Sequence, residues 1–224
     1  MAFLYETHMH TSEVSKCAVN TAAEQVKAYK NRGYTGIIVT DHFVHGYSNC
    51  PQHLPWDKKI DFIMTGYYNA KKAGEKYGLQ VFLGWEFPDY GWDFLTYGLD
   101  EDFLKAYPSL LGMPVEEYSP LVRKHGGYIA QAHPFRDADY VQRHHPADHR
   151  LLDGMEVFNA SISKKINAKA LTFAEQHGLA KQAGSDSHSA WLRTTGGIKL
   201  QKPAADIFDI IRALKTGDVE LKTG

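Results

Sequence analysis

The sequence predicts one α/β domain over residues 1–224, with a mainly parallel sheet that is either doubly wound or closed into a barrel. Three observations predict it. Amphipathic helical stretches alternate with short β-branched strands, a glycine follows the helix at four of these joints, and no low-complexity tract, charge run or Pro/Ser-rich linker divides the chain. A chain of 224 residues is also long enough to bury a full hydrophobic core.

The expected elements follow one another in a regular order. Thr21 and Glu24 fit a capping box, in which each side chain satisfies a free backbone donor of the other residue at a helix start. Residues 46–55 and 136–149 are expected to be long loops. The first two expected joints are a helix from Thr21 to Gly33 before strand 36–40, and a helix capped by Asp57 that ends near Gly78 before strand 79–83. The other two are a helix within 115–124 before strand 128–130, and a helix from Ile162 to Gly178 before strand 179–183. Further strands are expected at 3–7, 94–98 and 154–158.

Composition excludes several function classes. Lys and Arg total 25 against 26 Asp and Glu, and a net charge of −1 gives no general attraction to long nucleic acids or anionic membranes. No apolar run approaches the roughly 18–20 residues of a membrane span. The first six residues lack the pattern of a secretion signal, and two cysteines make no disulfide framework, so a cytoplasmic location is expected. No oligomeric state is predicted.

Histidines and carboxylates recur at the ends of the expected strands. His8 and His10 leave the first strand on one face, because alternate residues of a strand do so. The carboxyl ends of the strands in an α/β barrel meet at one rim, where such proteins carry their chemistry. Imidazole and carboxylate are the usual ligands of zinc, manganese and iron, so the pattern predicts a metal site at this rim. The other residues in such positions are Asp41, His42, Glu86, His133, Glu156, Asn159, Asp186 and His188.

Each of these signals has an ordinary structural explanation when taken alone. An isolated histidine after a strand is more often a hydrogen-bonded loop residue than a ligand. Cys17 and Cys50 have no Arg six residues later, and the chain has no Cys-x-x-Cys, Gly-x-Ser-x-Gly or Gly-rich phosphate loop, so hydrolysis by a metal-activated water is the chemistry that remains. The histidines read as loop residues are His45, His53, His125, His144, His145, His149 and His177.

Five short motifs in order resemble the PHP (polymerase and histidinol phosphatase) family of metal-dependent phosphoesterases. The resemblance extends from His8 to His188 and implies a distorted seven-stranded (β/α) barrel, (β/α)7, with up to three metals at its C-terminal rim. The motifs are His8–Met9–His10–Thr11, Thr40–Asp41–His42, Gly84–Trp85–Glu86, Ala132–His133–Pro134 and Gly184–Ser185–Asp186–Ser187–His188.

The resemblance also implies a ligand set. His8, His10, Glu86 and Asp186 would hold the first metal, Glu86 and His133 the second, and His42 and His188 the third. Two positions depart from the histidinol phosphatases. After the first motif, that group has a further His or Asp; in this chain Glu13 is the expected ligand and Cys17 the alternative. After the third motif, Asp93 is the expected ligand of the second metal, and the alternative is that Asp93 caps a turn or helix. Two or three divalent ions (Zn, Mn or Fe) are expected.

The function implied is hydrolysis of a phosphomonoester of a small metabolite by a metal-bridging hydroxide. Asp186, His188 and Arg136 are the expected catalytic residues, with Arg136 as a phosphate clamp or, alternatively, a surface salt bridge. Asp41 is expected to orient a ligand. The alternatives are histidinol-phosphate phosphatase specifically, an amidohydrolase-type metal hydrolase, and a non-catalytic metal-binding docking module. Weaker candidates are Glu156 and Asn159 as pocket residues, and Lys164 and Arg193 as anion contacts.

Overall fold

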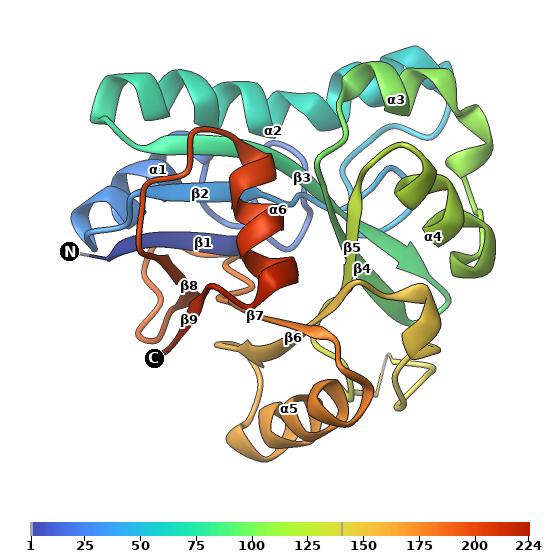
Figure 1. Ribbon diagram of the computed structural model, residues 1–224. Helices are drawn as coiled ribbons and strands as arrows, with labels where there is room; N and C mark the ends of the chain where they lie inside the picture. The colour runs from blue at the N-terminus through green and yellow to red at the C-terminus, as the bar shows by residue number, and fades with distance from the viewer. Residues whose placement is uncertain (1, 140) are drawn as a thin grey trace.

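A nearly closed, barrel-like sheet forms the centre of the molecule (Figure 1). The computed structural model describes residues 2–139 and 141–224, which form nine strands in the spatial order β7-β6-β5-β4-β3-β2-β1-β8-β9. The strands are β1 (Phe3–Met9), β2 (Gly36–Val39), β3 (Gln80–Asp89), β4 (Trp92–Tyr97), β5 (Tyr128–Gln131), β6 (Gly154–Asn159), β7 (Ala180–Gly184), β8 (Gly196–Leu200) and β9 (Glu220–Thr223). The helices are α1 (Ala22–Asn31), α2 (Trp56–Tyr77), α3 (Glu101–Ala106), α4 (Val115–Lys124), α5 (Lys164–His177) and α6 (Ile207–Thr216), with single 3-10 turns at Pro108–Leu110 and His149–Leu151.

The sheet curls until β7, at one end of the strand series, meets β1, the third strand from the other end. The backbone N–H of His10 donates to Ser187 O at 2.9 Å, and the N–H of Ser187 donates to His8 O at 3.1 Å. The Thr7 hydroxyl donates to Ala183 O at 2.9 Å. These bonds bring the carboxyl ends of β1 and β7 together. The predicted α/β barrel-like fold is therefore confirmed, whereas the nine strands of the described chain leave the count of seven (β/α) units unconfirmed.

The expectation of a mainly parallel sheet was only half right. Among the strand pairs of the described residues, four are parallel and four antiparallel. The strand β4 runs antiparallel to both neighbours because a two-residue turn, Tyr90–Gly91, joins it to β3, and so short a connection can only reverse the chain. Both turn residues have positive φ, 43° and 96°, as the tightest hairpin turns require.

Local signals at the helix ends behaved as predicted in most places. The Thr21–Glu24 capping box is present at the start of α1, and Gly78 and Gly178 close α2 and α5 in the left-handed conformation. The cap assigned to Asp57 was wrong. Pro55 occupies the N-cap of α2 without a side-chain bond, so Asp57 lies in the first turn, where its charge favours the helix dipole.

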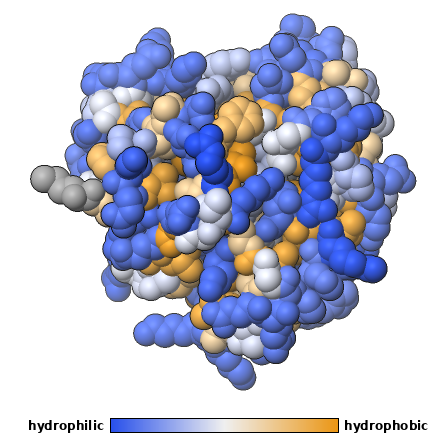
Figure 2. Space-filling model, viewed as in Figure 1, coloured by the Kyte–Doolittle hydropathy of each residue, from blue (hydrophilic) through white to orange (hydrophobic). Residues whose placement is uncertain are grey.

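The helices cover the outside of the barrel and one of its ends (Figure 1). The helices α1 and α2 pack on β2 through one apolar cluster that includes Val26, Ile37 and Ala70. The helix α6 packs Ile210 and Leu214 against residues of β4, β5 and β8. No helix within residues 2–139 and 141–224 is long and apolar enough to cross a membrane. Hydrophilic side chains cover most of the face seen in Figure 2, with apolar ones between them.

Candidate metal centre

Strand ends bring the predicted ligands together in the interior of the rim. His8 lies in β1 and His10 just beyond it, and both side chains are fully buried. Glu86 lies within β3 and forms a bridge with His42, the second residue past the predicted strand 36–40. Asp186 follows β7 by two residues and is 4% exposed. The parallel β1, β2, β3 and β7 thus converge on one cluster, as predicted.

Hydrogen bonds fix the rings of His8 and His10 so that their Nε2 atoms face each other. The His8 Nδ1 lies 3.0 Å from a Glu156 carboxylate oxygen, and the His10 Nδ1 lies 3.2 Å from Ser15 Oγ. Because the Ser15 hydroxyl donates to Asp41 at 2.7 Å, its oxygen accepts from His10, and the Nε2 of His10 carries a lone pair. The two Nε2 atoms are 3.1 Å apart, so at most one proton fits between them.

Carboxylate oxygens complete this first group. The His8 Nε2 lies 3.3 Å from Glu86 Oε1 and 3.5 Å from Asp186 Oδ1, and the His10 Nε2 lies 3.4 Å from the same Asp186 oxygen. Two ring nitrogens and two carboxylate oxygens therefore share one small buried volume with a single proton. A divalent cation is the species that such a donor set fits, since buried charges need pairing or a metal.

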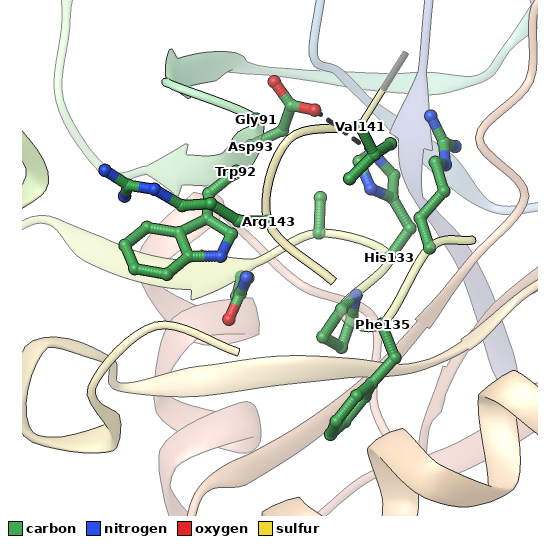
Figure 3. Close-up of a pocket in the computed structure, with 11 residues that line it drawn as sticks. Gly91, Trp92, Asp93, His133, Phe135, Val141 and Arg143 are labelled. Carbon is green, nitrogen blue, oxygen red and sulfur yellow. Dashed lines mark ion pairs between the residues drawn. The ribbon is translucent and has the colours of Figure 1, made fainter. Parts of the chain in front are cut away.

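The same rim contains a second group of donors. Glu86, Asp93 and His133 offer ligand atoms within 4.8 Å of one another. The His133 Nε2 lies 2.9 Å from Glu86 Oε1 and 3.8 Å from Asp93 Oδ2. Figure 3 shows the side chains of His133 and Asp93 turned toward each other. Asp93, expected as either a ligand or a cap, therefore lies at the cluster. Glu86 belongs to both groups, which suits a bridging ligand.

Two of these residues have strained backbones. His133 has φ 28° and Asp186 has φ 53°, values that side-chain-bearing residues rarely adopt. The His133 N–H donates to Glu156 at 2.8 Å, and the Asp186 carboxylate accepts from Ser161 Oγ at 3.1 Å and from the Arg136 guanidinium. Strain of this kind persists where surrounding contacts enforce it, and it is typical of functional sites.

Burial and mutual charge shift the pKa values of the cluster in opposite directions. Burial lowers the pKa of His8, but the carboxylates of Glu156, Asp186 and Glu86 outweigh it, so this pKa lies well above its usual value. Burial and the neighbouring His188 and His42 lower the pKa of His10 well below its usual value. The cluster thus favours one positive charge at the shared Nε2 position, which is where a cation would bind.

A third group contains His10, His42 and His188, whose ligand atoms also lie within 4.8 Å of one another. The His10 and His188 rings stack with centroids 4.2 Å apart, and the His10 and His42 centroids are 4.4 Å apart. Cys17 Sγ lies 3.2 Å from His42 Nε2. Burial raises the pKa of Cys17, but hydrogen bonds with His188 and His42 outweigh it and lower this pKa to about 6.

The structure does not bring Glu13 to this cluster. Its carboxylate accepts from the Ala22 N–H at 2.9 Å, at the start of α1, and from Asn69 Nδ2 at 3.3 Å. Helix N-termini favour a carboxylate, which explains this position. Cys17, the alternative, contacts the predicted ligand His42.

Several residues orient the predicted ligands through hydrogen bonds, directly or through another side chain. Asp41 accepts from the Thr11 N–H and hydroxyl and from Ser15, so it orients His10 through the Ser15 hydroxyl. Asn159 Nδ2 donates to Glu156 at 2.8 Å. Ser15 and Ser161 were not predicted as site residues, because a serine acquires such a role only from its neighbours in space. Lys164 and Arg193, the weaker anion candidates, are exposed.

The cluster opens into a cleft of about 760 Å³, the size of a small-molecule site. Two cationic side chains, Lys16 and Arg136, line it, together with Tyr47. Arg136 pairs with Asp186, with 19% of its side chain exposed, so it lies at the border between the donor groups and the open cleft. The surface salt bridge considered as its alternative is therefore replaced by an ion pair at the site. The remaining lining residues are Cys17, His42, His45, Gly46, Glu86, Pro88, Gly91, Asp93, His133, Val141, Gln142, Ser161, Asp186 and His188.

The β3–β4 hairpin holds the loop that carries Arg136. Trp92 Nε1 donates to His145 O at 2.7 Å, and the Arg143 guanidinium lies 4.0 Å from the centre of the Trp92 ring (Figure 3). Gly91 lets the two segments approach, since a Cβ there would lie 2.9 Å from Gln142 N. Trp92 therefore acts on the cleft through this loop.

Substitution of Trp92 should release the loop. We expect Trp92→Leu to lose a hydrogen bond worth about 1 kcal/mol and a cation–π contact worth about 0.5–1 kcal/mol. Cleavage by trypsin at Arg143 should then become roughly tenfold faster, because about 1.4 kcal/mol changes an opening equilibrium tenfold. Trp92→Phe keeps the ring and should show a smaller increase. Trp191→Leu is the control, since Trp191 is 75% exposed; equal cleavage rates in all four proteins would contradict the role of Trp92.

Fold and site together define an α/β-barrel protein with a candidate metal centre at the carboxyl ends of its strands. A family model described as PHP-associated matches residues 165–219. No curated protein sequence shows significant similarity to the chain. Solved structures that share the fold at low identity include the following three.

A candidate metal-dependent phosphoesterase from Bifidobacterium adolescentis has a TM-score of 0.61 and 17% identity, covering 96% of each chain. A two-domain protein from Bacteroides vulgatus, containing a predicted PHP-like metal-dependent phosphoesterase, has a TM-score of 0.67 and 15% identity. The match covers 100% of the present chain and 65% of the Bacteroides chain. An amidohydrolase from Chromobacterium violaceum with bound sulfate and no metal has a TM-score of 0.60 and 15% identity over 94% and 96%. Together with the PHP-associated match, these findings confirm the resemblance to the PHP family.

Proposed function

We propose that the protein is a metal-dependent phosphoesterase that hydrolyses a phosphomonoester of a small metabolite. The observation that carries the proposal is the donor arrangement, in which His8, His10 and Asp186 converge with Glu86 and leave room for one proton among four donor atoms. Divalent ions bound there would supply an activated water and neutralise charge on phosphoryl oxygens. The neighbours named as phosphoesterases support the same class.

The chain's own residues fit an anionic substrate. Lys16 and Arg136 line the cleft beside the donor groups, and Arg136 presents the planar fork that suits a phosphate. The role of Asp186 would be to hold Arg136 as well as a metal, since one of its carboxylate oxygens faces the guanidinium and the other faces His8 and His10. A cleft of about 760 Å³ accommodates a metabolite rather than a polymer.

Removal of the Arg136 fork should weaken substrate binding. For Arg136→Ala at saturating metal, we expect the KM for p-nitrophenyl phosphate to rise about tenfold or more, because hydrogen bonds to charged groups contribute about 1.5–3 kcal/mol. Arg136→Lys, which keeps the charge without the fork, should lie between. Arg150→Ala is the control, since that side chain is 79% exposed and pairs only with Asp148 among the described residues. An unchanged KM in Arg136→Ala would exclude Arg136 from phosphate binding.

The experiment that tests the function is elemental analysis of the purified protein, with p-nitrophenyl phosphate turnover measured on the same sample. We expect two or three equivalents of divalent metal and turnover that a chelator abolishes. An amidohydrolase is the second candidate, because a neighbour of the same fold bears that name. Metal without phosphatase turnover, but with hydrolysis of amide substrates, would favour it. No metal after reconstitution with zinc, manganese or iron would overturn both.

A further inference from the structure

A thiol lies beside the third donor group. Cys17 Sγ lies 3.2 Å from His42 Nε2, and Cys17, His42 and His188 line the same cleft. For a tetrahedral zinc ion, the usual bond lengths to sulfur and nitrogen place these two atoms about 3.5 Å apart. Cys17 is therefore already near a ligand position relative to His42. The chain has one other cysteine, Cys50, which is 4% exposed and has its Sγ 3.9 Å from Lys59 O.

The two histidine rings present lone pairs toward the thiol. The His188 Nδ1–H donates to Asp186 O at 3.0 Å, which leaves the lone pair on Nε2. The His42 Nδ1 lies 2.7 Å from Glu86 Oε2, a negative charge that favours the ring proton on Nδ1, and the His42 Nε2 lies 3.2 Å from Cys17 Sγ. The cleft thus brings two ring lone pairs and one thiol proton to this position. The surplus of lone pairs repeats the arrangement around His8 and His10.

We propose that Cys17 is a thiolate ligand of a metal ion held together with His42 and His188, and that this position selects a borderline or soft divalent cation such as Zn²⁺ over Mg²⁺ or Ca²⁺. Binding breaks the S–H bond, forms a sulfur–metal bond and releases the proton to solvent. A thiolate and two imidazoles are ligands that zinc and cobalt accept, whereas magnesium and calcium require oxygen. The proposal deepens the proposed function, because it names the metal class for part of the same site.

Spectroscopy of the cobalt-substituted protein tests the thiolate without reference to activity. We expect titration of the metal-free protein with Co²⁺ to produce a sulfur-to-cobalt charge-transfer band in the near ultraviolet whose final intensity corresponds to one thiolate-bound ion per chain. Cys17→Ser should lose the band, and Cys50→Ser, the matched control, should keep it. Cys17→Asp should keep the metal equivalent but lose the band. In parallel, Zn²⁺ should protect Cys17 from alkylation by iodoacetamide, whereas Mg²⁺ should not.

The affinity of the same position gives a second readout. Chelator competition should show that Cys17→Ser binds its weakest zinc equivalent at least about tenfold less tightly, since even the loss of outer-shell partners costs about 10–100-fold. Glu13→Gln, at the carboxylate that contacts Ala22, should keep all zinc equivalents.

Several outcomes would overturn the proposal. A charge-transfer band that persists in Cys17→Ser, or that is absent from the cobalt-saturated wild-type protein, would remove Cys17 from the metal. Loss of a zinc equivalent in Glu13→Gln alone would favour the carboxylate. Failure of the proposed function is a separate result. A cobalt–thiolate band in a protein without phosphatase turnover would support Cys17 as a ligand and contradict the proposed activity. Turnover without the band would support the activity and remove Cys17 from the metal.

Discussion

Asp186→Asn should remove metal from the first donor group and abolish hydrolysis while leaving the fold intact. The Asp186 carboxylate faces His8 and His10 through one oxygen, so the loss of its charge removes an anionic ligand from the first group. Asparagine is the suitable replacement because Asp186 has φ 53°, a left-handed conformation that Asn tolerates and Ala does not. We expect the loss of at least one metal equivalent and a decrease in kcat of at least about a thousandfold, since metal-ion catalysis contributes several kcal/mol.

Thermal unfolding with and without metal separates this effect from misfolding. A ligand at 100 times its Kd stabilises the native state by about 2.7 kcal/mol, so Zn²⁺ should raise the Tm of the wild-type protein more than that of Asp186→Asn. Asp137→Asn is the control, because the Asp137 side chain is 84% exposed. Wild-type metal content and turnover in Asp186→Asn would refute the site. His8→Ala should also lose metal, with an added cavity cost at its fully buried position.

The sequence predicted those parts of the fold whose signals are local. The capping box at Thr21 and the glycines after α2 and α5 depend on a few adjacent residues, and the structure has them where expected. The direction of β4 depended on the turn at Tyr90–Gly91, which the sequence analysis did not consider. Asp206 and Gly217, the caps of α6, were equally local signals that were missed.

The site was predictable where it depends on strand ends. His8, Glu86 and Asp186 lie on different strands or just beyond them, and the barrel topology alone brings them together. The loop after β1 could not be predicted in this way. Which of its residues faces the cluster is decided by contacts with distant segments, such as Glu13 with the start of α1 and Cys17 with His42.

Gly66 in α2 supports the metal site from outside, and its substitution should weaken metal binding without changing any ligand. A Cβ at this position would overlap Asp41 Oδ2 and lie 2.5 Å from Thr11 Oγ1. Asp41 cannot move away freely, because it is 5% exposed and holds the Ser15 hydroxyl that accepts from His10. A displaced Asp41 therefore releases the His10 ring, whose Nε2 belongs to two of the donor groups.

For Gly66→Ala we expect a loss of about 1–3 kcal/mol in the unfolding free energy of the metal-free protein, the usual cost of overpacking, against which the better helix propensity of Ala returns at most about 1 kcal/mol. Zinc affinity, measured by chelator competition, should fall about 10–100-fold, as for other losses of outer-shell support. Thr65→Ala is the matched control, since Thr65 is the exposed neighbour in the same helix. If Gly66→Ala folds and binds zinc as tightly as Thr65→Ala does, the Asp41–Ser15 contact does not orient His10, and the ring is held by the strand alone.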